Sequence, residues 1–268
     1  MIRFSALWTL MAGVPLLATA QSGTVRYDEA TRLDIELPPG MARNPAFMAN
    51  LPKSTVRPVQ LQFTDEASLF TQVRNAPEEG RVIAGGEFRT MGGDAVMIRE
   101  ITPEMMQMGR AMGFVGGGAS ASVAGAFTNL ADDSYVEVRE FLGRTFRIPT
   151  ERPTFAWKLT GEAASFLGHP VYQAVAQQDS TTLEAWFTPD IPVSAGPAQY
   201  GGLPGLILTL AVDSNRVVYT ATAIDLETPV EKITAPKDGS EVTREEYDKI
   251  VAEKLAEMAR SRRGRSNN

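Results

Sequence analysis

The stretch Ala185–Val212, AWFTPDIPVSAGPAQYGGLPGLILTLAV, decides the fold of this chain. It is punctuated by prolines and glycines and ends in Leu206–Val212, a run that is apolar at nearly every position. Such a run predicts a strand that is covered on both faces or lies centrally in a sheet. Before this run, Leu203-Pro204-Gly205-Leu206 fits a type II turn, because proline presets φ at the second position and glycine accepts a positive φ at the third.

Strands are predicted on both sides of this stretch. Thr181–Phe187 leads into it, and Arg216–Ala223 returns after the turn residues Asp213–Asn215 as the second half of a hairpin. The connection from Thr188 to Gly202 is long for a loop without regular structure in a compact domain. We therefore expect this loop either to be packed down by its own prolines and Tyr200 or to be functional.

Short segments in which apolar and polar residues alternate occur along the rest of the chain. They lie at Thr24–Tyr27, Leu33–Leu37, Val59–Phe63, Ala67–Val73, Tyr135–Phe141, Thr145–Ile148, Ala156–Leu159 and Val171–Gln177. Short strands with turn residues between them are typical of a β-sandwich, barrel or half-barrel. The sequence therefore predicts a mainly β fold.

The C-terminus changes to helical spacing. Thr243 and Glu246 fit a capping box at a helix start. Five apolar residues then fall on one helix face: Tyr247, Ile250, Val251, Leu255 and Met258. We predict an antiparallel curved sheet or half-barrel, similar by analogy to lipoprotein carriers, with a C-terminal amphipathic helix packed across it.

Met1–Ala20 has the features of a secretory signal peptide, with a basic residue near its start, an apolar core and a small-residue end. The apolar core is too short for a stable membrane anchor, which needs about 20 residues. No cysteine follows for lipid attachment. We expect an exported protein, periplasmic or secreted, without stable membrane insertion. Residues 21–259 should form a single β-rich domain, followed by a basic disordered tail at residues 260–268.

The composition argues against several kinds of catalytic and binding site. The net charge of −6 argues against nucleic acid as a partner. The chain has no cysteine and a single histidine, His169, so thiolate catalysis and a zinc site are not expected. It also lacks the Gly-x-Ser-x-Gly elbow that would supply a nucleophilic serine. We predict that the protein is not an enzyme and needs no cofactor.

Residues 75–125 are rich in glycine and methionine, and we interpret them as a flexible insertion. In a helix, Met105, Met108 and Met112 would share one face, and thioethers are soft ligands that select Cu(I). A loosely packed apolar patch explains the same spacing. A Cu(I) site at these three methionines is therefore the alternative hypothesis.

Ten residues of the central stretch form an ordered pattern: Trp186, Pro192, Gly196, Pro197, Gly202, Leu203, Pro204, Gly205, Leu206 and Ile207. This pattern resembles the signature of the GLPGLI family, exported bacterial proteins with no established biochemical activity. Upstream, Trp157–Thr160 and Gly168–Ala174 also resemble segments of the family, and the similarity extends more loosely from about Thr24 to Met258. Val171–Ala174 lack the cysteine and lysine of the family's corresponding segment.

Trp186, Phe187 and Tyr200 are candidate ligand-lining residues near this motif. Packing in the core or anchoring of the loop explains these aromatic residues equally well. We expect a non-enzymatic envelope protein that binds an apolar ligand or a protein partner. The alternative function is Cu(I) binding through the methionine-rich segment.

Overall fold

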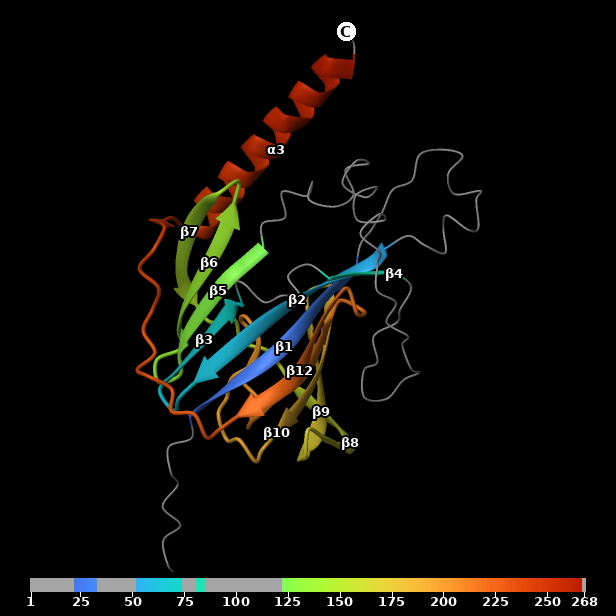
Figure 1. Ribbon diagram of the computed structural model, residues 1–268, viewed down its shortest axis with the longest axis vertical. Coiled ribbons are helices and arrows are strands. Elements are labelled where there is room, and N and C mark those ends of the chain that lie inside the picture. The colour runs from blue at the N-terminus through green and yellow to red at the C-terminus, as the bar shows by residue number, and fades with distance from the viewer. Residues whose placement is uncertain (1–21, 33–51, 74–80, 85–121, 267–268) are drawn as a thin grey trace, which may run out of the picture.

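The computed structural model describes residues 22–32, 52–73, 81–84 and 122–266. Its elements are β1 (Gly23–Arg32), β2 (Pro52–Phe63), β3 (Ala67–Gln72), β4 (Arg81–Ala84), β5 (Ser122–Asn129), β6 (Ser134–Phe141), β7 (Arg144–Glu151), β8 (Lys158–Phe166), β9 (His169–Gln178), β10 (Thr181–Thr188), β11 (Leu206–Val212), β12 (Val217–Asp225), β13 (Ser240–Glu241) and α3 (Arg244–Ser266). The strands form one sheet, with the helix at one end (Figure 1).

The strand order is β13-β7-β6-β5-β3-β2-β1-β12-β11-β10-β9-β8, and β4 pairs with β2 beside this path. Every pair is antiparallel except β13 with β7. Because β13 and β8 stand at the two ends of the path, the sheet stays open. The prediction of a mainly β fold with a C-terminal helix is confirmed.

Several strand boundaries differ from the expectation. β1 is continuous from Gly23 to Arg32, and β5 begins at Ser122, inside the segment that we interpreted as an insertion. The segment Leu33–Leu37, predicted as a strand, lies outside the described residues, as do the predicted signal peptide and residues 85–121. β5 has the sequence SVAGAFTN, in which small residues hide the apolar alternation that marks a strand.

The sheet is curved, and it has a core face and an outer face. The core face carries Tyr27, Leu61 and Phe70 among the buried residues of the main cluster. The ring centroids of Phe70 and Tyr219 are 6.0 Å apart, although β2 and β1 separate their strands. Neighbouring strands are about 4.8 Å apart, so a flat sheet would keep these two strands about 14 Å apart. Curvature brings the two rings together on the core face.

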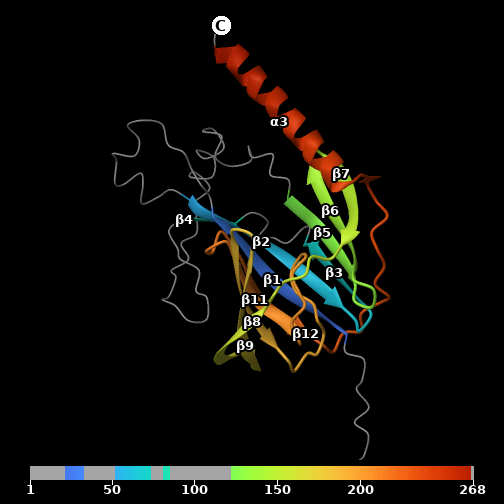
Figure 2. The ribbon, with the colours of Figure 1, turned by 180° about the vertical axis from the view of Figure 1, so that it is seen from behind.

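Residues 152–157 cross the core face as a strap. They connect β7, near one end of the sheet, with β8, at the other end. The strap carries Phe155 and Trp157, whose ring centroids are 5.7 Å apart and which pack against the main core. The crossing joins the two halves of the sheet (Figure 2). It also brings the aromatic side chains of the strap against the main core.

The helix α3 contacts the sheet only through its first turns, which differs from the predicted packing across the sheet. Tyr247 is buried against Phe146, with ring centroids 5.4 Å apart, and Ile250 and Val251 pack beside them. Leu255 is 44% exposed, and the helix projects away from β7 (Figure 1). The helix also continues to Ser266, past the expected start of a disordered tail at residue 260.

A buried carboxylate attaches the helix to the sheet. Glu137 on β6 is 2% exposed and forms ion pairs with Arg139, at 2.6 Å, and with Arg244 at the start of α3. A buried charge is tolerated only where opposite charges and hydrogen bonds compensate it. In the described part of the chain, no helix combines the length and apolar character needed to cross a membrane.

The Tyr27 hydroxyl provides a test of the core. It is buried and donates a hydrogen bond of 2.7 Å to the carbonyl of Ile207, and burial raises the pKa of this phenol. Tyr27→Phe should lower the free energy of unfolding by about 1–3 kcal/mol, because the buried carbonyl loses a donor. Urea denaturation measures the change. Tyr172→Phe, at a residue that is 42% exposed, is the control and should change stability by less than about 0.5 kcal/mol. Equal effects of the two substitutions would contradict the assignment.

Candidate functional site

The loop at residues 189–205 is packed onto the core face, which is one of the two outcomes expected for it. Its inward residues are buried: Ile191, Val193, Ala195, Ala198 and Leu203. All of them belong to the main core cluster, together with residues of the sheet. Tyr200 anchors the outer part of the loop, with its ring centroid 5.4 Å from that of Phe155 on the strap. Burial raises the pKa of Tyr200.

Hydrogen bonds from β11 and from the strap fix the backbone of the loop. The amide N–H groups of Leu206 and Ile207 donate to the carbonyls of Ile191 and Ala195, both at 3.0 Å. From the strap, the indole Nε1 of Trp157 donates to the carbonyl of Gly201 at 2.8 Å. A loop buried in this way needs such partners, because its polar backbone groups have lost contact with water.

Arg152 is the second strap residue that holds the loop. Its Nη2 donates to the carbonyl of Ser194 at 2.8 Å, and its Nη1 lies 3.8 Å from a carboxylate oxygen of Asp133. Burial lowers the pKa of the guanidinium, and the nearby Asp133 opposes this effect. Arg152 therefore connects the loop, the strap and the turn between β5 and β6.

The turn before β11 differs from the predicted type II turn. Gly205 has a positive φ, as expected, but its value is 156° rather than the roughly 80° of a type II turn. Its amide N–H donates to the carbonyl of Leu203 at 2.8 Å, which makes a three-residue γ-turn around Pro204. The glycine is needed here mainly because its backbone closely approaches Thr188.

The three candidate ligand-lining residues lie in different surroundings. Phe187 is buried beside Tyr172, with ring centroids 6.2 Å apart, and Tyr200 packs on the strap. Trp186 is 5% exposed and is the cross-strand partner of Thr209. Among the described residues, the indole Nε1 of Trp186 has no hydrogen-bond partner. None of the three lines the pocket described below.

His169 lies on the surface near the loop. Its Nδ1 is 3.3 Å from a carboxylate oxygen of Asp190, which joins the start of β9 to the start of the loop. In the part of the chain that the structure describes, no group of three or more acidic, histidine or cysteine side chains could hold a metal ion. Met105, Met108 and Met112 lie outside the described residues.

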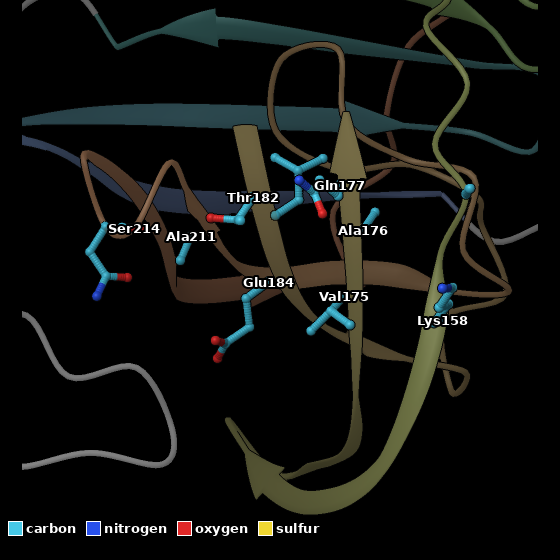
Figure 3. Close-up of a pocket in the computed structure, with 11 residues that line it drawn as sticks. Lys158, Val175, Ala176, Gln177, Thr182, Glu184, Ala211 and Ser214 are labelled. Carbon is cyan, nitrogen blue, oxygen red and sulfur yellow. The ribbon is translucent and has the colours of Figure 1, made fainter. Parts of the chain in front are cut away.

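A pocket of about 550 Å³ lies at the β8 end of the sheet (Figure 3). Its lining residues come from the strap, from β8 to β11 and from the turn after β11: Ala156, Lys158, Val175, Ala176, Gln177, Thr182, Leu183, Glu184, Ala211, Ser214 and Asn215. Small-molecule sites in proteins have volumes of about 300–1,000 Å³. The pocket is therefore large enough for a small ligand or a side chain of a partner.

The strand register explains how the pocket residues come together. Val175 on β9 is the cross-strand partner of Lys158 on β8 and, on its other side, of Glu184 on β10. Glu184 is in turn the cross-strand partner of Ala211 on β11. Residues paired in this way point to the same face of a sheet. Ala211 belongs to a small buried cluster that is separate from the main core, so this row lies on the outer face. Lys158 and Glu184 thus stand on either side of an apolar residue.

β8 is the strand at one end of the sheet, and it is paired only with β9 among the described strands. Most of its side chains are exposed, including Leu159, which is 65% exposed. The pairing with β9 shifts register between Leu159 and Ala163, and Gly161 there has a φ of 88°. The backbone N–H and C=O groups on the free side of an edge strand can form hydrogen bonds with a further strand. The register shift limits such pairing to the parts of β8 before and after it.

The sequence patterns singled out the loop but did not predict the pocket. The loop has a dense local signal in its prolines and glycines, whereas Lys158 and Glu184 are ordinary charged residues on two different strands. The alternation of Thr181–Phe187 already placed Glu184 on the opposite face from Leu183. The pairing of β8, β9 and β10 was the missing information.

Residues 150–209 match the model of a family described as a protein of unknown function (Porph_ging). The matched range runs from the end of β7 through the strap, the loop and the start of β11. No curated protein matches the chain. The family match therefore covers the part of the structure in which the strap and the loop pack together.

Two solved structures of PNGF-II are similar to the chain. One, in space group P21, has a TM-score of 0.50 and 15% sequence identity, and the match covers 86% of this chain and 33% of that chain. The other, in space group C2, has a TM-score of 0.47 and 14% identity, and covers 87% and 33% of the two chains. The chain thus spans about a third of the length of these solved structures, and the likeness concerns the fold.

Gly205→Ala tests the packing of the loop. The added Cβ would overlap the carbonyl group of Thr188, with its carbon at 2.7 Å and its oxygen closer still. The loss of stability should exceed about 2 kcal/mol, measured by urea denaturation, because a backbone clash adds to the strain of a positive φ.

Gly168→Ala is the matched control for this variant. Gly168 has a φ of 84° and nothing within 4 Å of an added Cβ, so only backbone strain of about 1 kcal/mol is expected. If Gly205→Ala costs no more than Gly168→Ala, the close approach to Thr188 is not a constraint on this fold.

Proposed function

We propose that this chain is an exported, non-enzymatic binding protein of the GLPGLI family, and that it binds an extended segment of a protein partner along β8. The observation that carries the proposal is the position of β8 at the end of the sheet, with exposed apolar side chains. Addition of a strand to such an edge is a common mode of peptide recognition. The family name rests on the motif residues 202–207, which lie within the range 150–209 that matches a family of unknown function.

The packing of the loop favours a protein partner over an apolar ligand inside the sheet. In a carrier of the lipoprotein type, the apolar ligand would occupy the core face. Here Ile191, Val193 and Leu203 of the loop occupy that face and are at most 5% exposed. A ligand there would have to displace the loop and break its hydrogen bonds to β11 and the strap.

The comparison with PNGF-II concerns the fold alone. In those structures, the part that is similar to this chain accounts for 33% of a longer chain. The same fold therefore occurs there together with further protein. Because fold alone does not determine function, the proposal rests on the exposed edge at β8 and not on this comparison.

Site-specific photocrosslinking tests this proposal. We would place p-benzoylphenylalanine at Leu159 on β8 and, as the control, at Leu142, which is 52% exposed at the turn between β6 and β7. In the native envelope, a discrete adduct should form from position 159 and not from position 142. Ala163→Lys should reduce the adduct severalfold, since a lysine on an edge strand opposes pairing.

Leu142→Lys provides the matched control for that second change and should leave the adduct from position 159 unaltered. Equal adducts at the two positions, or an adduct that persists with Ala163→Lys, would refute strand addition at β8. Thermal melting of each variant confirms that a lost adduct does not reflect unfolding.

The copper alternative stays a prediction, because its ligands lie outside the described residues. If Met105, Met108 and Met112 bind Cu(I), a competition titration with a Cu(I) chelator should show one bound ion. Binding should disappear when all three are replaced by leucine, and Met258→Leu on α3 should leave it unchanged. Retention of copper by the triple variant, or no binding by the unaltered protein, removes this hypothesis.

A further inference from the structure

The pocket at the β8 end holds two opposite charges, and neither has an ion-pair partner among the described residues. No ion pair of Lys158 or Glu184 occurs in the part of the chain that the structure describes. The neighbouring turn differs, because Asp213 and Arg216 pair with each other at 3.6 Å. Charged side chains that line a pocket and lack partners are available to a ligand.

The separation of the two charges is set by the sheet. Lys158, Val175 and Glu184 occupy consecutive positions in one cross-strand row. Two strand spacings amount to about 10 Å, and Val175 lies between the two charged residues in this row. Figure 3 shows Val175 between Glu184 and the strand that carries Lys158. The row therefore presents a carboxylate, an apolar middle and an amino group.

Neutral hydrogen-bonding groups complete the lining. Gln177 and Thr182 are cross-strand partners next to this row, and Ser214 and Asn215 come from the turn after β11. Amide and hydroxyl groups can both donate and accept hydrogen bonds. They suit a ligand whose charged ends carry further donors and acceptors.

We propose that this pocket binds a dipolar ligand, in which an ammonium or guanidinium group lies against Glu184 and a carboxylate lies against Lys158. A short aliphatic stem between the two charges would cover Val175. A basic amino acid has this chemistry, either as the free molecule or as the C-terminal residue of a peptide. The site is separate from strand addition at β8 and does not depend on it.

Isothermal titration calorimetry with three probes tests the site. L-Arginine carries both charged groups, agmatine lacks the carboxylate, and an N-acetylated tripeptide ending in arginine presents the same groups on a peptide. Arginine or the tripeptide should bind at least about tenfold more tightly than agmatine, because a charge-assisted hydrogen bond is lost in agmatine. Tighter binding of the tripeptide indicates a peptide terminus as the ligand, and tighter binding of arginine indicates the free amino acid.

Two variants separate the ends of the ligand. Glu184→Gln should weaken arginine and agmatine by the same factor, about tenfold or more. Lys158→Met should weaken arginine alone and bring its affinity to that of agmatine. Glu162→Gln and Lys249→Met, at exposed charged residues outside the pocket, are the matched controls and should leave both affinities unchanged.

Several outcomes would overturn the site. The first is that neither L-arginine nor the tripeptide binds. The second is that Glu184→Gln leaves the affinity for arginine unchanged. The third is that Glu162→Gln or Lys249→Met weakens binding as much as the variants in the pocket do. Circular dichroism and thermal melting of each variant exclude unfolding as the cause of lost binding. The photocrosslink from position 159 measures strand addition independently of ligand binding in the pocket. A failure of the pocket to bind therefore does not contradict strand addition at β8, and a missing crosslink does not contradict the pocket.

Discussion

The rest of the structure depends on the filling of the core face by the loop at residues 189–205. A curved sheet leaves space on its inner side, and protein interiors are packed as densely as organic crystals. This chain fills the space with Ile191, Ala195 and Leu203. The loop is buried at the cost of its contact with water, so its carbonyls need donors. β11, Trp157 and Arg152 provide them.

This filling decides where the protein can interact. The core face is occupied by the chain itself, and the strap at residues 152–157 crosses it. The edge at β8 and the pocket on the outer face remain accessible. Both are formed by the strands that follow the strap. The part of the sheet at β5, β6 and β7 is instead joined to α3, through Glu137 and the contact of Phe146 with Tyr247.

Local patterns in the sequence predicted strands that alternate clearly, such as Tyr135–Phe141, and the apolar strand Leu206–Val212. For the loop they left burial and a functional role as two open outcomes. They did not predict β5, where Gly125 lies against β3 and an added Cβ would be 3.3 Å from the carbonyl oxygen of Phe70. Small residues permit that contact and at the same time remove the apolar signal. The pocket was missed for another reason, because strand order and register are properties of the whole chain.

The GLPGLI-like hexapeptide has a structural meaning that directs the search for function elsewhere. Gly205 accommodates the backbone of Thr188, and the neighbouring Gly201 leaves room for the guanidinium of Arg152. Leu203, Leu206 and Ile207 are at most 2% exposed, and Ile207 accepts the hydrogen bond from Tyr27. Every one of these roles concerns packing. A signature of this kind identifies how the loop and sheet are assembled. The binding that we propose therefore uses surface residues outside the signature, namely Lys158, Glu184 and the edge of β8.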